Sequence, residues 1–361
     1  MEIDYITEPE APFPYEAWDA LNGYISGNYG GLSTEGLSME GYKETLRHLW
    51  EKLVEYLKKI ISWVKEKTMS DKRRLEQTRE QVEKVLGELH ALQVHRAPLD
   101  HVVVPMAAAE YRHLAKTPHD KVDIRMVGEA YRDMQRVMTL FFESHVDYVN
   151  AQVGLIVEAY GQFDVLKADE QLAQLKAKLA GLPFNGFGAN ETHIPIVGMS
   201  EIVLDKTSHP GLDELAIVVM KMSVSSPTTG FRAPPVGAAI AIMVNLREAL
   251  NRAIKFHEVI LPDLETTHKK LVSGGGMLLK RVNEIVGGNT DGDHITAIVK
   301  EMLSIEAKVA GSVLRPIVPA VGWMCTTAHA MSSLITRCVE AAQHQEAPKP
   351  GSITPALPAP Q

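Results

Sequence analysis

Residues 42–67 read YKETLRHLWEKLVEYLKKIISWVKEK, and this stretch decides the fold class. Its large apolar side chains recur at steps of three and four residues, with Lys and Glu between them: Leu46, Leu49, Trp50, Leu53, Leu57, Ile60, Ile61 and Val64. This spacing predicts a single apolar stripe along an α-helix, which turns once every ~3.6 residues. We expect these eight residues to bind a partner, either another helix or a second subunit, in preference to a membrane surface.

The helical pattern continues after a short interruption. Thr68-Met69-Ser70 breaks the apolar stripe, and Ser70 is a suitable N-cap for a second helix. Beyond it, Leu75, Val82 and Leu89 lie seven residues apart, which is a short coiled-coil repeat that ends before Pro98. Residues 41–97 are therefore expected to form an amphipathic helical hairpin or one long helical arm.

Helices are also predicted farther along the chain, with one change of character in the middle. The predicted helices cover 105–116, 127–160, 168–180, 238–259, 262–272, 277–286, 293–310 and 312–342, and the glycines at 274–276 and 287–288 serve as stop signals. Residues 194–204 and 215–224 are instead rich in β-branched residues and flank a turn-rich segment, which predicts a β-hairpin.

The fold class is thus mainly α: a multi-helix body with an amphipathic N-terminal helical arm and a small central β-hairpin. The expected segments are an acidic, disordered propeptide (1–40), the arm (41–97), a helical region (98–183), the hairpin with its loops (184–237), a C-terminal helical region (238–343) and a Pro-rich disordered tail (344–361).

Charge is distributed unevenly along the 361 residues. The first forty contain no Lys or Arg and eight acidic side chains: Glu2, Asp4, Glu8, Glu10, Glu16, Asp19, Glu35 and Glu40. Removing these eight from the 45 Asp and Glu of the chain leaves 37, which equals the 37 Lys and Arg. The net charge of −8 therefore belongs to this segment, which also lacks the basic and apolar stretches of a secretory signal.

Patterns that indicate catalysis or metal binding are weak. The glycines at 274–276 and Lys280 do not match a phosphate-binding loop, and residues 289–293 do not match a calcium loop. The most closely spaced histidines, His90, His95 and His101 and the pair His113 and His119, are five or six residues apart, which is not the spacing of two metal ligands on one helical face. Cys325 and Cys338 fit neither a disulfide framework nor a metal site and are expected to be buried. We therefore predict no catalytic residue, no metal site, no cofactor and no enzymatic activity.

The most specific pattern is a tandem repeat just before the first helix. Leu32-Ser33-Thr34-Glu35-Gly36 is followed directly by Leu37-Ser38-Met39-Glu40-Gly41, so that four of five positions match. The glycine-flanked stretch is expected to be extended, which is the state in which a protease can bind a chain. The small Ser and Gly leave Glu35 and Glu40 accessible for recognition.

Ser-x-Glu followed by a small residue resembles the site cut by prohead maturation proteases of giant, phiKZ-like tailed phages. The acidic leader, the repeat, the Trp-containing helix and the helical body resemble the internal head proteins of those phages. The resemblance implies cleavage sites formed by Ser33, Glu35, Gly36, Ser38, Glu40 and Gly41, with Glu40 as the final cut and Glu35 as an earlier or redundant one. It also implies a structural protein assembled in the host cytoplasm and packaged inside the capsid, with the protease, other head proteins and packaged DNA as candidate partners.

Two other classes of function remain open from the sequence. One is a membrane-active or ejected helical protein, which would use residues 42–67 and the apolar C-terminal helices against a bilayer. The other is an enzyme whose site is assembled from residues dispersed along the chain. Direct DNA binding is weakened by the Glu residues that alternate with Lys58, Lys59 and Lys72-Arg73-Arg74.

Overall fold

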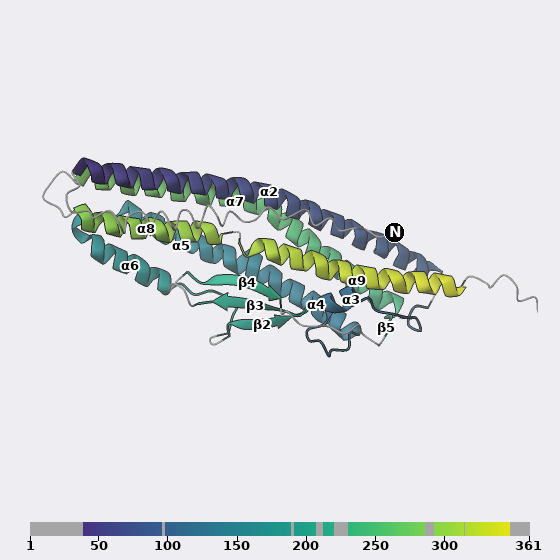
Figure 1. Ribbon diagram of the computed structural model, residues 1–361. Coiled ribbons are helices and arrows are strands. Elements are labelled where there is room, and N and C mark those ends of the chain that lie inside the picture. Colours follow the sequence, from purple (N-terminus) through teal and green to yellow (C-terminus); the bar gives the residue numbers. More distant parts are fainter. Residues whose placement is uncertain are drawn as a thin grey trace, which may run out of the picture.

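The structure is a computed structural model that describes residues 39–95, 98–188, 191–206, 212–219, 230–285, 292–313 and 315–346. It is mainly α-helical with a few short antiparallel strands, as the sequence predicts. The long helices run along a common axis and give the molecule an elongated shape (Figure 1). Their apolar faces meet in one continuous core that also receives side chains from the small sheet.

The N-terminal helix, α2 (Met39–Val94), is a single helix of 56 residues. Of the two predicted forms, a helical hairpin or one long helical arm, the structure has the long arm, and Ser70 is an exposed mid-helix residue instead of a cap. The interruption was misleading because the core-facing stripe continues through polar side chains: Thr68 and Asp71 are 6% and 8% exposed, between Ile60 and Leu75. A prediction from apolar residues alone misses buried polar positions of this kind.

Helix α7 (Val236–Ile285) is also longer than predicted, since one 50-residue helix replaces three expected ones. It contains Pro262, which was expected to begin a helix, and the glycine triplet 274–276, which was expected to end one. Lys65–Glu265 and Lys72–Glu258 ion pairs, each 2.8 Å, show that α2 and α7 lie side by side and antiparallel (Figure 1). Packing against α2 along its length stabilises α7 through residues that would end an isolated helix.

A third long helical segment crosses the bundle. It comprises α4 (Ile124–Val137), a π-helical stretch η1 (Met138–Ser144) and α5 (His145–Gly161), which together match the predicted 127–160 helix. The Asp123 side chain caps its start by accepting from the Arg125 amide at 2.9 Å. The short α3 (Ala108–Leu114) precedes it, and a 3-10 turn η2 (Val165–Lys167) and α6 (Ala168–Ala180) follow.

The C-terminal helices α8 (Gly292–Ser312) and α9 (Ile317–Glu346) follow one another along the bundle (Figure 1). Helix α8 packs against α2, α5 and α6, whereas α9 packs against α2 and α3. Cys325 and Cys338 are buried, unlinked side chains of α9, as expected.

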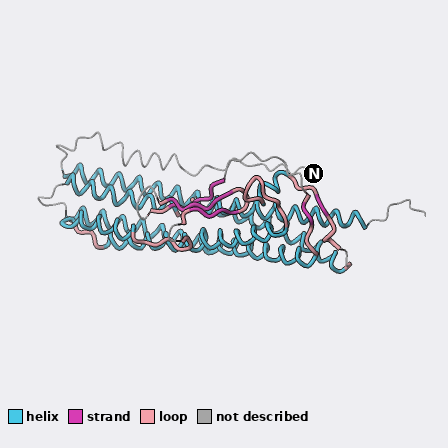
Figure 2. Tube along the Cα trace, turned by 90° about the horizontal axis from the view of Figure 1, so that it is seen from below, coloured by secondary structure: helices cyan, strands magenta, loops and turns pink. Residues whose placement is uncertain are grey.

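Two small antiparallel sheets complete the fold. β2 (His193–Ile196), β3 (Ser200–Asp205) and β4 (Glu214–Val219) pair in the order β2-β3-β4, so the predicted hairpin has one strand more than expected. The expected strand 194–204 is itself a tight hairpin. β1 (Val103–Val104) and β5 (Phe231–Arg232) form a two-stranded pair that the sequence did not predict. Figure 2 shows the strands lying on one side of the helices.

The turn between β2 and β3 anchors the sheet to the helices. Gly198 (φ 84°) and Met199 (φ 49°) both have left-handed backbone, and their amides donate to the Ala115 carbonyl at 3.0 and 2.9 Å. The amide of Val197 donates to Asp133 of α4 (3.0 Å), and its carbonyl accepts from the Trp323 indole of α9 (2.9 Å). Three helices therefore supply partners to one buried turn, which offsets its backbone strain.

Candidate functional site

The tandem repeat lies at the boundary where the described chain begins. Ser33, Glu35, Gly36 and Ser38 lie outside the described residues, as do residues 1–38 of the predicted leader and 347–361 of the predicted tail. Residues 344–346, which were expected to be part of the disordered tail, belong to α9 instead. Met39, Glu40 and Gly41 belong to α2, which begins three residues earlier than the stripe pattern predicts. The expectation of an extended backbone does not hold for Glu40 and Gly41, because the helix includes them.

This location still distinguishes the repeat from the Ser304-Ile305-Glu306 triplet, which lies in the middle of α8. The first turn of a helix has backbone amides without helical acceptors, so it opens at a lower free energy than the middle of a helix. Ala108-Ala109-Glu110 forms the first turn of α3, and Ala168-Asp169-Glu170 forms that of α6, so position in a helix does not separate these two triplets from the repeat. Glu110 and Glu306 are also buried, at 6% and 0% exposed.

The apolar stripe of α2 is used inside the molecule. Leu53, Leu57 and Ile60 are at most 2% exposed and belong to the central core. Ile61 is half-buried, and the side chains of Leu46, Leu49 and Val64 lie outside the described set. Of the two expected partners, another helix or a second subunit, these three buried residues have the first: α2 packs mainly on α7, α9 and α8 of its own chain.

Trp50, the aromatic residue of the stripe, packs onto the glycine triplet of α7. A Cβ placed on Gly275 would lie 2.1 Å from the Trp50 ring, and one on Gly274 would lie 3.3 Å from Tyr160. The triplet thus lets two large aromatic residues approach the α7 backbone closely. This contact explains why glycines that read as a stop signal occur within a helix.

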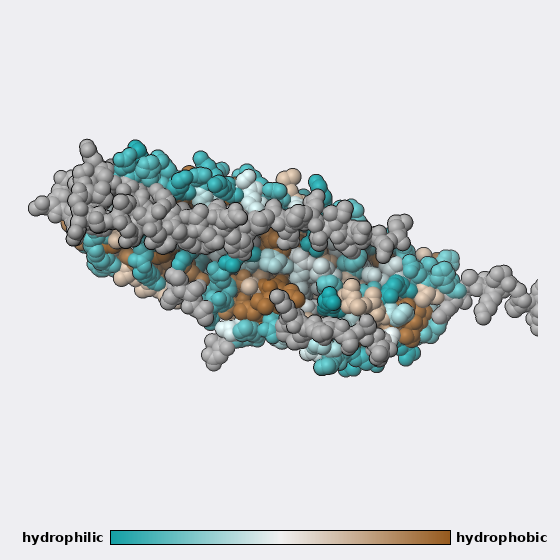
Figure 3. All heavy atoms as spheres, viewed as in Figure 1, coloured by the Kyte–Doolittle hydropathy of each residue, from teal (hydrophilic) through white to brown (hydrophobic). Residues whose placement is uncertain are grey.

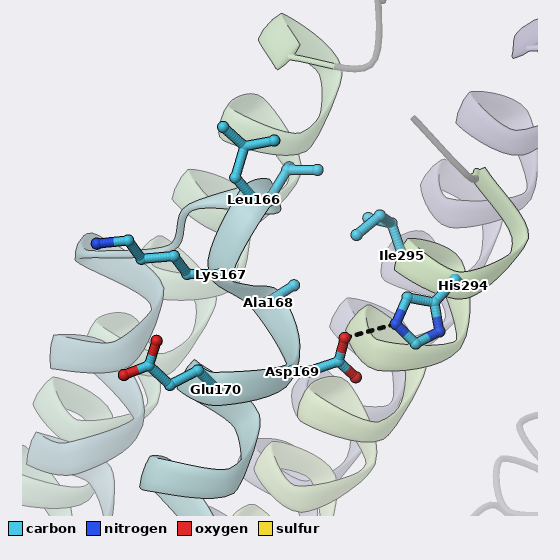
Figure 4. A pocket seen from close by; sticks show the side chains of 8 residues that line it. Leu166, Lys167, Ala168, Asp169, Glu170, His294 and Ile295 are labelled. Atoms are coloured by element: carbon cyan, nitrogen blue, oxygen red, sulfur yellow. Dashed lines mark hydrogen bonds and ion pairs between the residues drawn. The ribbon is translucent and has the colours of Figure 1, made fainter. Parts of the chain in front are cut away.

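A shallow cavity of about 400 Å³ lies where the first turns of α6 and α8 meet, and Figure 4 shows its lining. Asp169 of α6 and His294 of α8 point toward one another, with a 2.6 Å contact between their side chains. Lys167 and Glu170 point to the other side of α6. Because Asp169 is 74% and His294 50% exposed, this pair is worth little free energy, and only two polar groups converge.

Buried polar residues lie elsewhere, at helix contacts. Glu110 accepts hydrogen bonds from the Ala107 amide (3.0 Å) and Ser333 (2.9 Å) and pairs with Arg337. Asp133 contacts Lys116 at 3.4 Å in addition to the Val197 amide. Each of these carboxylates is paired with a cation and joins segments distant in sequence, which is a structural role.

Glu306 of α8 differs from them because its two carboxyl oxygens make no hydrogen bond of ordinary geometry. Desolvation by burial raises its pKa to about 8. The sequence held a signal for this residue that was missed: Glu306 lies at helical spacing among core residues of α8, Met302, Leu303, Val309 and Ala310.

Histidines in the described segments likewise do not gather into a metal site. No group of three or more His, Cys, Asp or Glu among these residues is placed to hold a metal ion. His145 of α5 is fully buried, and burial lowers its pKa to about 4. Its Nε2 lies 3.1 Å from the Ser312 carbonyl and 3.2 Å from that of Val313, at the C-terminal end of α8.

The chain is an elongated, mainly helical protein. In its described part, the buried ionisable side chains lie chiefly at contacts between helices. Comparison with known proteins adds no relative: the chain matches no protein-family model, no curated protein and no solved structure.

Proposed function

We propose that this protein is a non-enzymatic structural component of a phage virion, packaged inside the head and matured by proteolysis after Ser-x-Glu. The observation that carries the proposal is the place of the tandem repeat. Its first pentad ends at Gly36, before α2 begins at Met39, and its second overlaps the first turn of that helix. Cleavage there would separate an acidic segment from a helical body without cutting the core.

The distribution of charge supports the same reading. Cleavage after Glu40 removes all eight excess negative charges and leaves 37 basic and 37 acidic residues. Beside packaged DNA, a neutral body is repelled less than one of net charge −8. The leader would therefore act during assembly and be absent from the mature particle.

The start of α2 suggests an order for the two cuts. The Glu35–Gly36 bond precedes the helix, whereas the Glu40–Gly41 bond requires its first turn to open. Cleavage after Glu35 would come first. The residues that then remain before α2 would be removed by the second cut.

The arrangement of the body also favours a structural role. Its long helices share one core, and its buried Glu110 and Asp133 each tie helices or strands together. Other head proteins would bind the outer surface, since Leu53, Leu57 and Ile60 of the α2 stripe are buried within the chain.

A membrane-active or ejected protein is the second candidate. One segment, His294–His344, is long and apolar enough to cross a bilayer by length and composition. It covers most of α8 and α9, and more than half of its apolar window is buried inside the molecule. Leu53 and Ile60, which would enter a bilayer as part of the stripe, are also buried. Membrane insertion would thus require the bundle to open, which disfavours this function.

Mass spectrometry of the protein from purified particles tests the proposal. We expect a mature N-terminus at Gly41, with a minor form that begins at Gly36. Replacement of both Glu35 and Glu40 by Gln should preserve the full-length chain, whereas Glu44→Gln, at an exposed position of α2 outside the repeat, should be processed normally. An intact N-terminus in particles, or the absence of the protein from them, would refute the proposal.

A further inference from the structure

The helix α8 is fixed to α5 through buried polar contacts at two places. Near its middle, the Tyr160 hydroxyl of α5 donates to the Met302 carbonyl at 2.9 Å. At its C-terminal end, the Nε2 atom of His145 contacts the carbonyls of Ser312 and Val313. Both α5 side chains are at most 1% exposed, so these contacts form in the core.

Glu306 lies one helical turn after Met302, on the same face of α8. It is 0% exposed, and neither of its oxygens has a hydrogen bond of ordinary geometry. Tyr160 lies against this carboxyl, but its proton is donated to Met302. A carboxylate ion in this position would be buried without a cation, whereas the neutral acid avoids that cost.

The neighbouring helices supply no compensating positive charge in the described part of the chain. The ionisable side chains of α2, α5 and α7 that are buried in the described part of the chain are Tyr56, Asp71, His145, Tyr148, Tyr160, His257 and His268. Lys176 of α6 pairs with Glu301 on the outer side of α8. Of all these groups, Tyr160 is the one whose interaction affects the ionisation of Glu306.

We propose that Glu306 is a proton-dependent lock on α8: the helix is held firmly against α5 and α2 while the carboxyl keeps its proton, and less firmly once the proton is lost. The lock does not depend on the proposed cleavage, because Glu306 lies far from the repeat along the chain.

The direction of the effect follows from the pKa in the two states. The pKa of Glu306 is about 8 when α8 is seated and 4.5 when the carboxyl is exposed. Below pH 4.5 both states carry the proton, so the ratio of seated to open helix is at its highest value. Between pH 4.5 and about 8 only the seated state carries it, and the ratio of seated to open helix falls about tenfold per pH unit. Above pH 8 the ratio levels off.

Between pH 6.5 and 8, the ionisation of Glu306 affects the balance between seated and open α8, whereas that of His145, Tyr56 and Tyr148 does not. His145, whose pKa is lowered to about 4, changes the balance only below its exposed pKa of 6.5. Burial raises the pKa of Tyr148 from 10 to about 12 and that of Tyr56 well above its usual range, so these groups act only at more alkaline pH.

Amide hydrogen exchange of the full chain between pH 6.5 and 8 tests the lock. Protection factors of α8 amides, corrected for the intrinsic pH dependence of exchange, should fall roughly fifteenfold over this interval, since the tenfold fall per pH unit levels off near pH 8. In Glu306→Gln and Glu306→Leu the α8 factors should be independent of pH. Two variants are used because a buried amide and an apolar side chain perturb the core differently.

Glu301→Gln is the matched control, because it removes a carboxylate from the exposed side of the same helix and should keep the wild-type pH dependence. Protection of α8 that does not change between pH 6.5 and 8 in the wild type would overturn the proposal. An unchanged pH dependence in both Glu306 variants would do the same.

Discussion

At the residue scale, single side chains explain why α2 and α7 are joined as they are. Trp50 of α2 occupies a position on α7 where only a glycine fits, since a Cβ on Gly275 would overlap its ring. The adjacent Gly276 has open space around it, although it belongs to the same helix and the same triplet. Two neighbouring glycines therefore have opposite roles in stability.

Gly275→Ala should lower the free energy of unfolding by about 1–3 kcal/mol, because Trp50 or the α7 backbone must move to admit the methyl group. Gly276→Ala should instead raise it by about 0.5–1 kcal/mol, since alanine is the better helix former. Urea unfolding monitored by circular dichroism measures both. Equal effects of the two substitutions would show that the Trp50 contact does not determine the packing.

At the element scale, the small sheet depends on helices that are far from it in sequence. The backbone amides of its tight turn donate hydrogen bonds to Ala115 and Asp133, and a backbone carbonyl of the turn accepts one from Trp323. Antiparallel strands this short are not stable alone, so the helices determine whether the sheet forms.

Asp133→Ala should destabilise the protein by about 2–4 kcal/mol, because the buried Val197 amide loses its acceptor and Lys116 loses one of its two carboxylates. Glu129→Ala removes the other carboxylate, 3.0 Å from Lys116, but Glu129 is one-third exposed, and its loss should cost less than about 1 kcal/mol. Thermal unfolding compares the two variants. Hydrogen exchange at the Val197 amide should accelerate only in Asp133→Ala, and similar costs for both would contradict this account of the turn.

Element boundaries show what a residue pattern can and cannot reveal. The helices 127–160 and 168–180 were predicted closely because their apolar spacing agrees with the final packing, and α6 ends directly before Gly181. The breaks expected at Ser70, Pro262 and the glycine triplet were wrong, because contacts between α2 and α7 outweigh the local preference of those residues. The two-residue strands β1 and β5 have too few residues to carry a pattern.

At the scale of the whole molecule, the acidic leader and the helical body are separable by charge. The body carries the core, and all eight excess negative charges precede Gly41 in the chain. Removing the leader should therefore change the electrostatics of the protein much more than its fold.

A chain that begins at Gly41 should keep the helical circular dichroism spectrum of the full protein and should unfold within a few degrees of it. It should elute from an anion exchanger at markedly lower salt at pH 7, since its formal charge rises from −8 to zero. A large loss of helix would show that the leader is part of the folded core. Comparison with a chain in which the eight acidic residues are replaced by their amides separates charge from length.

The sequence by itself determined the helical class, most helix positions, the charge boundary at residue 40 and the repeat that marks it, because these depend on local spacing and composition. Tertiary structure decided the continuity of α2 and α7, the fate of the apolar stripe and the burial of Glu306. Each of these depends on which faces meet in space. An apolar stripe on one helix predicts that this face will be buried, but not which element will cover it. A carboxyl on an apolar face acquires a raised pKa only when neighbouring helices exclude water from it.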